Sequence, residues 1–94
     1  MTDSFILLPK AQKELLDAWE WYEDRQPGLG DAFQRELHRK IKFIIANPLH
    51  YPQKGRYREA IIDVFPYLIV FGIDNSSIII ISIFHMSRHP KRKY

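Results

Sequence analysis

The chain has 94 residues, of which 46% are hydrophobic and 27% are charged, with no cysteine and a formal net charge of +3. This length suits one domain over residues 1–94, and the apolar content is that of a globular protein rather than a disordered one. The lack of cysteine excludes disulfides and thiolate metal sites. The sequence shows no secretory signal and no apolar run near ~18 residues, so we expect a cytoplasmic protein that does not enter membranes.

The first predicted elements are a short strand and a helix. The strand is the apolar run "SFILL", residues 4–8, and it is followed by Pro9. Proline has no N–H to donate, so it suits the first turn of a helix. Apolar side chains then recur at i, i+4, i+7, i+8 and i+11, which predicts a helix over residues 10–24. Its apolar face consists of Ala11, Leu15, Ala18, Trp19 and Tyr22.

A second helix is predicted over residues 31–46, after the breaker "QPGLG". Asp31 is the expected N-cap, because its carboxylate is able to accept from free N–H groups of the first turn. Lys40 falls near the middle of the apolar stripe and is expected to extend its ammonium outward. The short connection predicts an antiparallel helical hairpin. The apolar stripe consists of Phe33, Leu37, Ile41, Ile44 and Ile45.

Three strands are predicted in the C-terminal half. Residues 57–64 alternate between two faces, residues 67–73 are β-branched and aromatic, and residues 78–85 are strongly apolar. The order β-α-α-β-β-β predicts an α+β fold, with the helical hairpin packed on a mostly antiparallel four-stranded sheet. Two helices cover only one face of such a sheet. We therefore expect a face or an edge to be left for a protein partner, unless the sheet curls and buries both faces itself.

Motif searches give no cofactor or metal site. The glycines do not have the spacing of a nucleotide-binding loop, and there is neither an HExxH motif nor a serine nucleophile elbow. The four histidines lack the spacing of metal ligands. No cofactor and no metal are therefore expected.

Basic residues are the main functional signal. Residues 1–31 carry a net charge of −4, so residues 32–94 carry +7. The first basic cluster consists of Lys54, Arg56 and Arg58, and the second follows the last strand and consists of Arg88, Lys91, Arg92 and Lys93. We expect the two clusters to lie together beside His85. Such a patch would bind phosphates, cleave RNA without a metal, bind an acidic protein, or serve only as a solvated surface.

Several segments resemble one known family. They are "AQKELLDAWEWYEDRQPGLGDAF", the "NP" after the second helix, "YREAIIDVFPYLIVFGID" and the closing "HMSRHP". In order and spacing, residues 5–92 resemble the RelE/ParE superfamily of bacterial toxins, also called plasmid-stabilisation proteins. The resemblance implies the toxin of a type II toxin–antitoxin system, whose surface is occupied by the C-terminal segment of a cognate antitoxin.

The resemblance also implies a choice between two targets. RelE-like members cut mRNA in the ribosome, whereas ParE-like members inhibit DNA gyrase. The ribonuclease branch typically has an arginine directly after the aromatic residue that opens the third predicted strand, and here Leu68 follows Tyr67. With the H-x-x-R-x-P ending, this favours the gyrase inhibitor, which is not an enzyme. A RelE-like endoribonuclease and a non-toxic binding module with the same fold are the alternatives.

The residues expected to act follow from the target. For contact with the target or the antitoxin, the expected residues are Arg56, Arg58, His85, Arg88, Lys91 and Arg92. For a ribonuclease, the candidate catalytic residues are Lys54, Arg56, Arg58, His85 and Arg88. The expected partners are thus an antitoxin and either gyrase or the ribosome with its mRNA.

Overall fold

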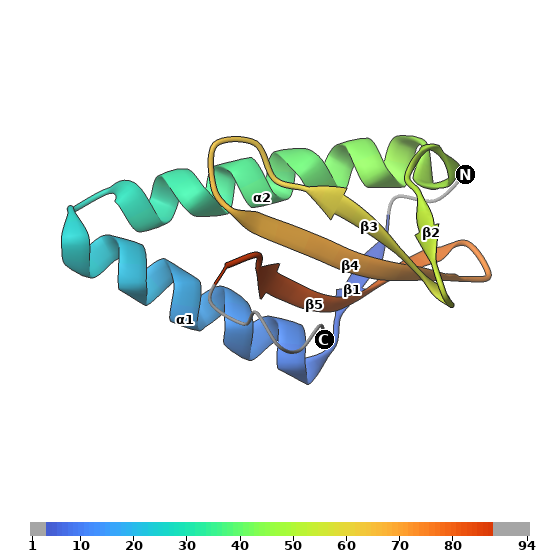
Figure 1. The fold of residues 1–94 in the computed structure, drawn as a ribbon, viewed down its shortest axis with the longest axis horizontal. Helices are drawn as coiled ribbons and strands as arrows, with labels where there is room; N and C mark the ends of the chain where they lie inside the picture. Colours follow the sequence, from blue (N-terminus) through green and yellow to red (C-terminus); the bar gives the residue numbers. More distant parts are fainter. Residues whose placement is uncertain (1–3, 88–94) are drawn as a thin grey trace.

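In the computed structural model, which describes residues 4–87, two long helices lie on one face of a five-stranded sheet (Figure 1). The elements in chain order are β1 (Phe5–Leu7), α1 (Pro9–Arg25), α2 (Leu29–Ala46), the 3-10 helix η1 (Pro48–His50), β2 (Gln53–Lys54), β3 (Tyr57–Ile61), β4 (Tyr67–Asp74) and β5 (Ser77–His85). Across the sheet the order is β1-β5-β4-β3-β2; β1 runs parallel to β5, and the other neighbours are antiparallel. This confirms the α+β class. The fifth strand, β2, was not predicted, because two exposed residues show no alternation.

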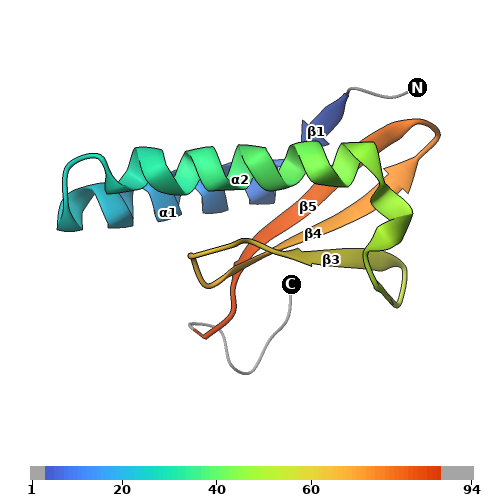
Figure 2. The same ribbon diagram turned by 90° about the horizontal axis from the view of Figure 1, so that it is seen from above.

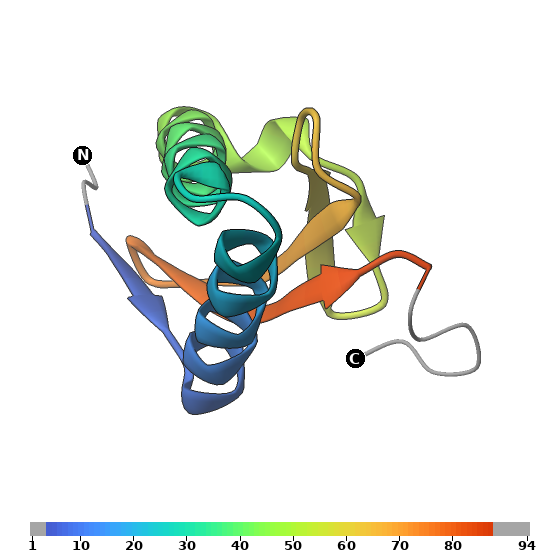
Figure 3. The same cartoon turned by 90° about the vertical axis from the view of Figure 1, so that its left-hand side faces the viewer.

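Both predicted helices are confirmed, with the expected faces inward. Ala11, Ala18 and Tyr22 of α1 are buried, and so are Phe33 and Leu37 of α2. The helices lie side by side over the sheet, as their end-on view shows (Figure 3). Aromatic rings fill the space between the hairpin and the strands: the centroid of Phe33 lies 5.4 Å from that of Tyr22. Burial of such large rings contributes strongly to the hydrophobic stabilisation of the core.

The turn between the helices is held by side chains of α1. The prediction that Asp31 caps α2 is wrong, because the helix begins at Leu29 after Gly28, whose φ is 89°. The carboxylate of Glu23 accepts hydrogen bonds from the N–H groups of Gly28 and Gly30, at 2.8 and 2.9 Å. The acceptor for the first turn of α2 therefore comes from the preceding helix. Asp31 instead accepts from the indole N–H of Trp19 at 3.0 Å.

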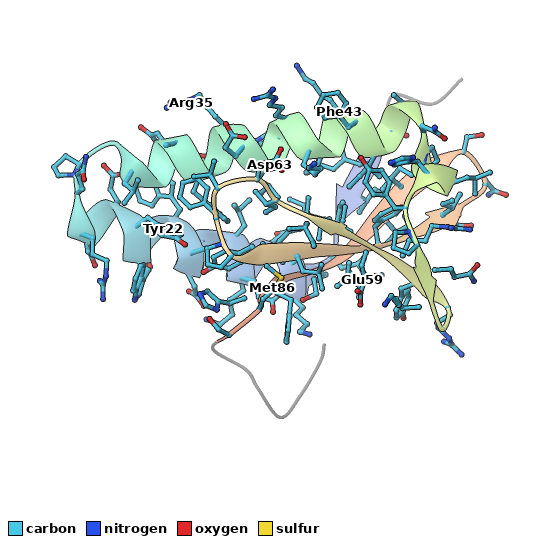
Figure 4. All side chains as sticks on the ribbon, turned by 45° about the horizontal axis from the view of Figure 1, so that its top comes forward. Tyr22, Arg35, Phe43, Glu59, Asp63 and Met86 are labelled. Atoms are coloured by element: carbon cyan, nitrogen blue, oxygen red, sulfur yellow. The ribbon has the colours of Figure 1, made fainter. Side chains whose placement is uncertain are left out.

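The strand predicted over residues 57–64 ends at Ile61 and is followed by a turn. Val64 in this turn has a φ of 76°, a conformation that β-branched residues rarely adopt, so pairing with β4 stops before it. The turn lies beside α2, where Figure 4 labels Asp63. The Lys40 side chain is only 17% exposed, and its ammonium lies 3.7 Å from the Asp63 carboxylate. This contact joins the middle of α2 to the turn.

The second face of the sheet is less open than expected. Leu68, Val70 and Phe84 form an apolar cluster on it, with exposed fractions of 6%, 0% and 6%. Tyr57 and Ile81 pack against this cluster. The folded chain buries these strand residues itself, so this face leaves less apolar surface for a partner than expected.

Candidate functional site

The first basic cluster forms a small hairpin. Lys54 ends β2, and Gly55 turns the chain with a φ of 63° so that Arg56 and Tyr57 lead into β3. Lys54 and Arg56 are exposed, so their charges are open to a partner. Two exposed cations on a tight turn are suited to contacting an anionic surface, but they do not enclose a ligand.

Arg58 has a different environment. Its side chain is half-buried, and its guanidinium donates to the backbone oxygen of Tyr51 at 2.8 Å and to the side-chain oxygen of Gln53 at 3.4 Å. Both acceptors are neutral. Arg58 therefore fastens the segment before β2 to β3, and its charge is only partly available to a partner.

Tyr51 completes this corner of the molecule. Its ring packs edge-on against Phe71, with 6.0 Å between the centroids. Burial, and secondarily the negative charge of Asp63, raises the pKa of the Tyr51 phenol above its ordinary value. The phenol is therefore held protonated near neutral pH and is unsuited to act as a general base.

His85 lies at the far end of β5. It is paired with Tyr67 across the strands, and the two rings meet edge-on with 4.9 Å between their centroids. The backbone N–H of Ser87 donates to Nδ1 of His85 at 3.1 Å. In the neutral imidazole the proton is then on Nε2, which leaves that nitrogen as the donor.

The structure separates the basic hairpin from His85. Arg58 is opposite Phe71 on β4, whereas His85 is opposite Tyr67, four residues back along the same strand. At about 3.4 Å per residue the two levels are about 14 Å apart. Figure 2 shows the hairpin and the end of β5 at opposite ends of the sheet. The expectation that the two lie together is wrong for the described residues; Arg88, Lys91 and Arg92 fall outside them.

The described part of the chain contains no obvious metal-binding site. Within residues 4–87 there is no group of three or more His, Asp or Glu side chains that is placed to hold an ion. Among the same residues, no helix is long and apolar enough to cross a membrane.

A shallow groove on the helical hairpin was missed by the sequence reasoning. It is lined by Gln12, Leu15, Leu16, Trp19 and Gln34. Leu16 is 55% exposed, although it adjoins the inward-facing Leu15. Its apolar side chain on the outer flank of α1 was the available signal. Such a groove fits an apolar segment of a protein partner.

Comparison with known proteins gives one family and one fold. Residues 5–90 match the family model described as the ParE toxin of the type II toxin–antitoxin system parDE. A chain from the solved chromosomal ParDE system of P. aeruginosa superimposes with a TM-score of 0.78 at 15% identity, covering 89% of this chain and 96% of that one. That likeness concerns the fold. No curated protein matches the sequence.

Proposed function

We propose that this chain, which belongs to the ParE toxin family of type II toxin–antitoxin systems, arrests growth by inhibiting DNA gyrase in the cytoplasm and is neutralised by a cognate antitoxin. Family membership makes the chain a ParE-type toxin. The gyrase target, the antitoxin and the cytoplasmic location are our inference.

Leu68 is the observation that carries the choice of gyrase over mRNA. By resemblance, the ribonuclease branch has an arginine at this position. Here the side chain is buried in the apolar cluster with Val70 and Phe84. No cation from this position is available to steady a scissile phosphate, and losing one such group typically costs about 3 kcal/mol of transition-state stabilisation.

The spacing of the other candidate residues agrees with this choice. Metal-free RNA cleavage needs a general base and a general acid within hydrogen-bond reach of one phosphodiester. Arg58 is engaged by Tyr51 and Gln53, and His85 lies about 14 Å away along the strands. The described residues thus favour a contact surface over a ribonuclease centre.

We propose that two separate basic regions, the hairpin and the end of β5, contact the target or the antitoxin. Arg56 presents its charge on the hairpin with Arg58 behind it, and His85 marks the second place. Arg88, Lys91 and Arg92, outside the described residues, would add charge after β5. An antitoxin segment with acidic side chains complements such charges, and its apolar side chains fit the groove beside Leu16.

Induction in bacterial cells tests this function if plasmid topology and mRNA integrity are followed together. Gyrase inhibition gives relaxed plasmid and broken chromosomal DNA while mRNA stays intact, and co-expression of the antitoxin restores growth. Cuts in ribosome-bound mRNA with normal plasmid supercoiling would replace this proposal with the RelE-like alternative. Growth without arrest, from protein shown to be folded, would leave a non-toxic binding module.

A further inference from the structure

A band of basic side chains, of which Arg35, Arg39 and Lys42 carry charge, runs along the outer face of α2. Arg35, His38, Arg39 and Lys42 recur at i, i+3, i+4 and i+7, which places them on one side of the helix. All four are exposed. Figure 4 shows Arg35 on the side of α2 that faces away from the strands. With Asp31 and Gln34 they border a shallow hollow.

The two acids of α2, Asp31 and Glu36, offset part of this charge but form no ion pair with Arg35 or Lys42 among the described residues. Asp31 accepts from Trp19, and Glu36 is 3.9 Å from Arg39. An exposed pair at that distance holds Arg39 only weakly. Within residues 4–87, neither Arg35 nor Lys42 has an ion-pair partner.

We propose that this face of α2, the α2 cationic face, binds the phosphate backbone of duplex DNA. The rise of 1.5 Å per residue separates Arg35 from Lys42 by about 10 Å along the helix, so the two cations are able to contact different phosphates of one duplex. Sequence-independent binding to DNA needs only such phosphate contacts.

Two features favour duplex DNA over other anionic partners. An acidic peptide is usually anchored by apolar or aromatic side chains at the centre of the interface, whereas all the residues around this hollow are polar. A single strand of nucleic acid needs several aromatic rings on which its bases stack, and among the four residues of the α2 cationic face His38 alone has a ring. Phosphate contacts with a rigid duplex need neither.

This inference does not rest on the gyrase proposal, because it is measured with DNA alone. Fluorescence anisotropy of a labelled 20-base-pair duplex is followed as the salt concentration rises, for the wild type and for R35Q/K42Q. The double variant should bind about tenfold more weakly at low salt. Its plot of log affinity against log salt should be shallower by about 1.8, which corresponds to two phosphate contacts.

The matched control is K10Q/K13Q, which removes the same charge from the exposed side of α1. It should keep the wild-type salt dependence. Equal losses in both double variants, no loss in R35Q/K42Q, or no wild-type binding would overturn the inference. So would tighter binding of a poly-glutamate peptide or of single-stranded RNA at this face. If the toxin inhibits gyrase but fails this test, the proposed DNA contact is wrong and the proposed function stands.

Discussion

Gly30 lets the two helices approach closely at the start of the hairpin. A β carbon at this position would lie 2.6 Å from the backbone oxygen of Trp19 and 2.8 Å from Oε1 of Glu23. Real β carbons essentially never come so close to other atoms. The backbone oxygen has little freedom to move, and Glu23 already accepts from the N–H of Gly30. The two helices therefore pack this closely only because Gly30 has no side chain.

Replacing Gly30 with alanine should destabilise the protein, although alanine is favoured over glycine in helices by up to about 1 kcal/mol. Overpacking costs about 1–3 kcal/mol, so we expect a net loss of about 1–2 kcal/mol in the free energy of unfolding, measured by urea denaturation. Gly72→Ala is the control, because its β carbon would meet Tyr57 at an ordinary 3.7 Å. A Gly30→Ala protein more stable than the wild type would contradict this packing.

Tyr51 should make stability depend on pH in the alkaline range. Burial and Asp63 raise its pKa in the folded state above the ordinary value of 10.0, so the folded protein holds this proton more tightly than the unfolded chain does. The resulting stabilisation is fully present below pH 10 and is lost as the pH rises through the folded pKa. Tyr51→Phe keeps the ring against Phe71 and removes this titration.

The measurement is the free energy of unfolding of both proteins at several pH values above and below 10. The wild type should lose more stability above that pH than Tyr51→Phe, since the other titrating groups are common to both. Asp63→Asn should give an intermediate loss, because it removes the smaller of the two causes. Identical pH profiles for the wild type and Tyr51→Phe would show that Tyr51 does not contribute.

At the scale of elements, Glu14 joins α1 to the edge of β5. The parallel partner β1 ends at Leu7, opposite Ile80, so among residues 4–87 no strand pairs with this edge of β5 beyond that point. Oε1 of Glu14 accepts from the hydroxyl of Ser82 at 2.8 Å and from the N–H of Ile83 at 2.9 Å. One carboxylate thus satisfies two donors that the short first strand leaves unpaired.

Glu14→Ala should lower the free energy of unfolding by about 2–3 kcal/mol, because it leaves a part-buried backbone N–H and a buried hydroxyl without an acceptor. Glu14→Gln retains an acceptor oxygen and should lose less. Chemical denaturation provides the measurement, with Glu20→Ala on the exposed side of the same helix as the control. If the Glu14→Ala and Glu20→Ala proteins were equally stable, this link between helix and sheet would have no energetic weight.

The elements that the sequence predicts well are those whose signal is local. The apolar stripes of both helices reappear as buried faces, and the strands predicted over residues 67–73 and 78–85 form as β4 and β5. The errors arise where the partner is distant in sequence. Asp31 seemed a cap because a local oxygen was assumed, whereas Glu23 supplies it from the other helix. Likewise, the bonds of Glu14 to residues 82–83 have no sequence signature.

At the scale of the molecule, the basic residues were found from the sequence but not their arrangement. The clustering of basic residues along the sequence, together with the family resemblance, identifies Arg56 and His85 as functional candidates. Their separation depends on the register of β4, which pairs Phe71 with Arg58 and Tyr67 with His85. The α2 cationic face was overlooked because its residues are interleaved with the apolar stripe of the same helix. In both cases the three-dimensional positions decide which charges act together.

Inhibition of gyrase by the purified protein is the most direct test of the central claim. Supercoiled plasmid, gyrase, ATP and the toxin are incubated, and linear DNA with covalently attached gyrase is quantified. We expect linear product that increases with toxin and disappears when the cognate antitoxin is added. Absence of that product, from protein that still arrests growth and yields cut mRNA in a translating extract, would contradict the gyrase target and assign the toxin to the ribosome.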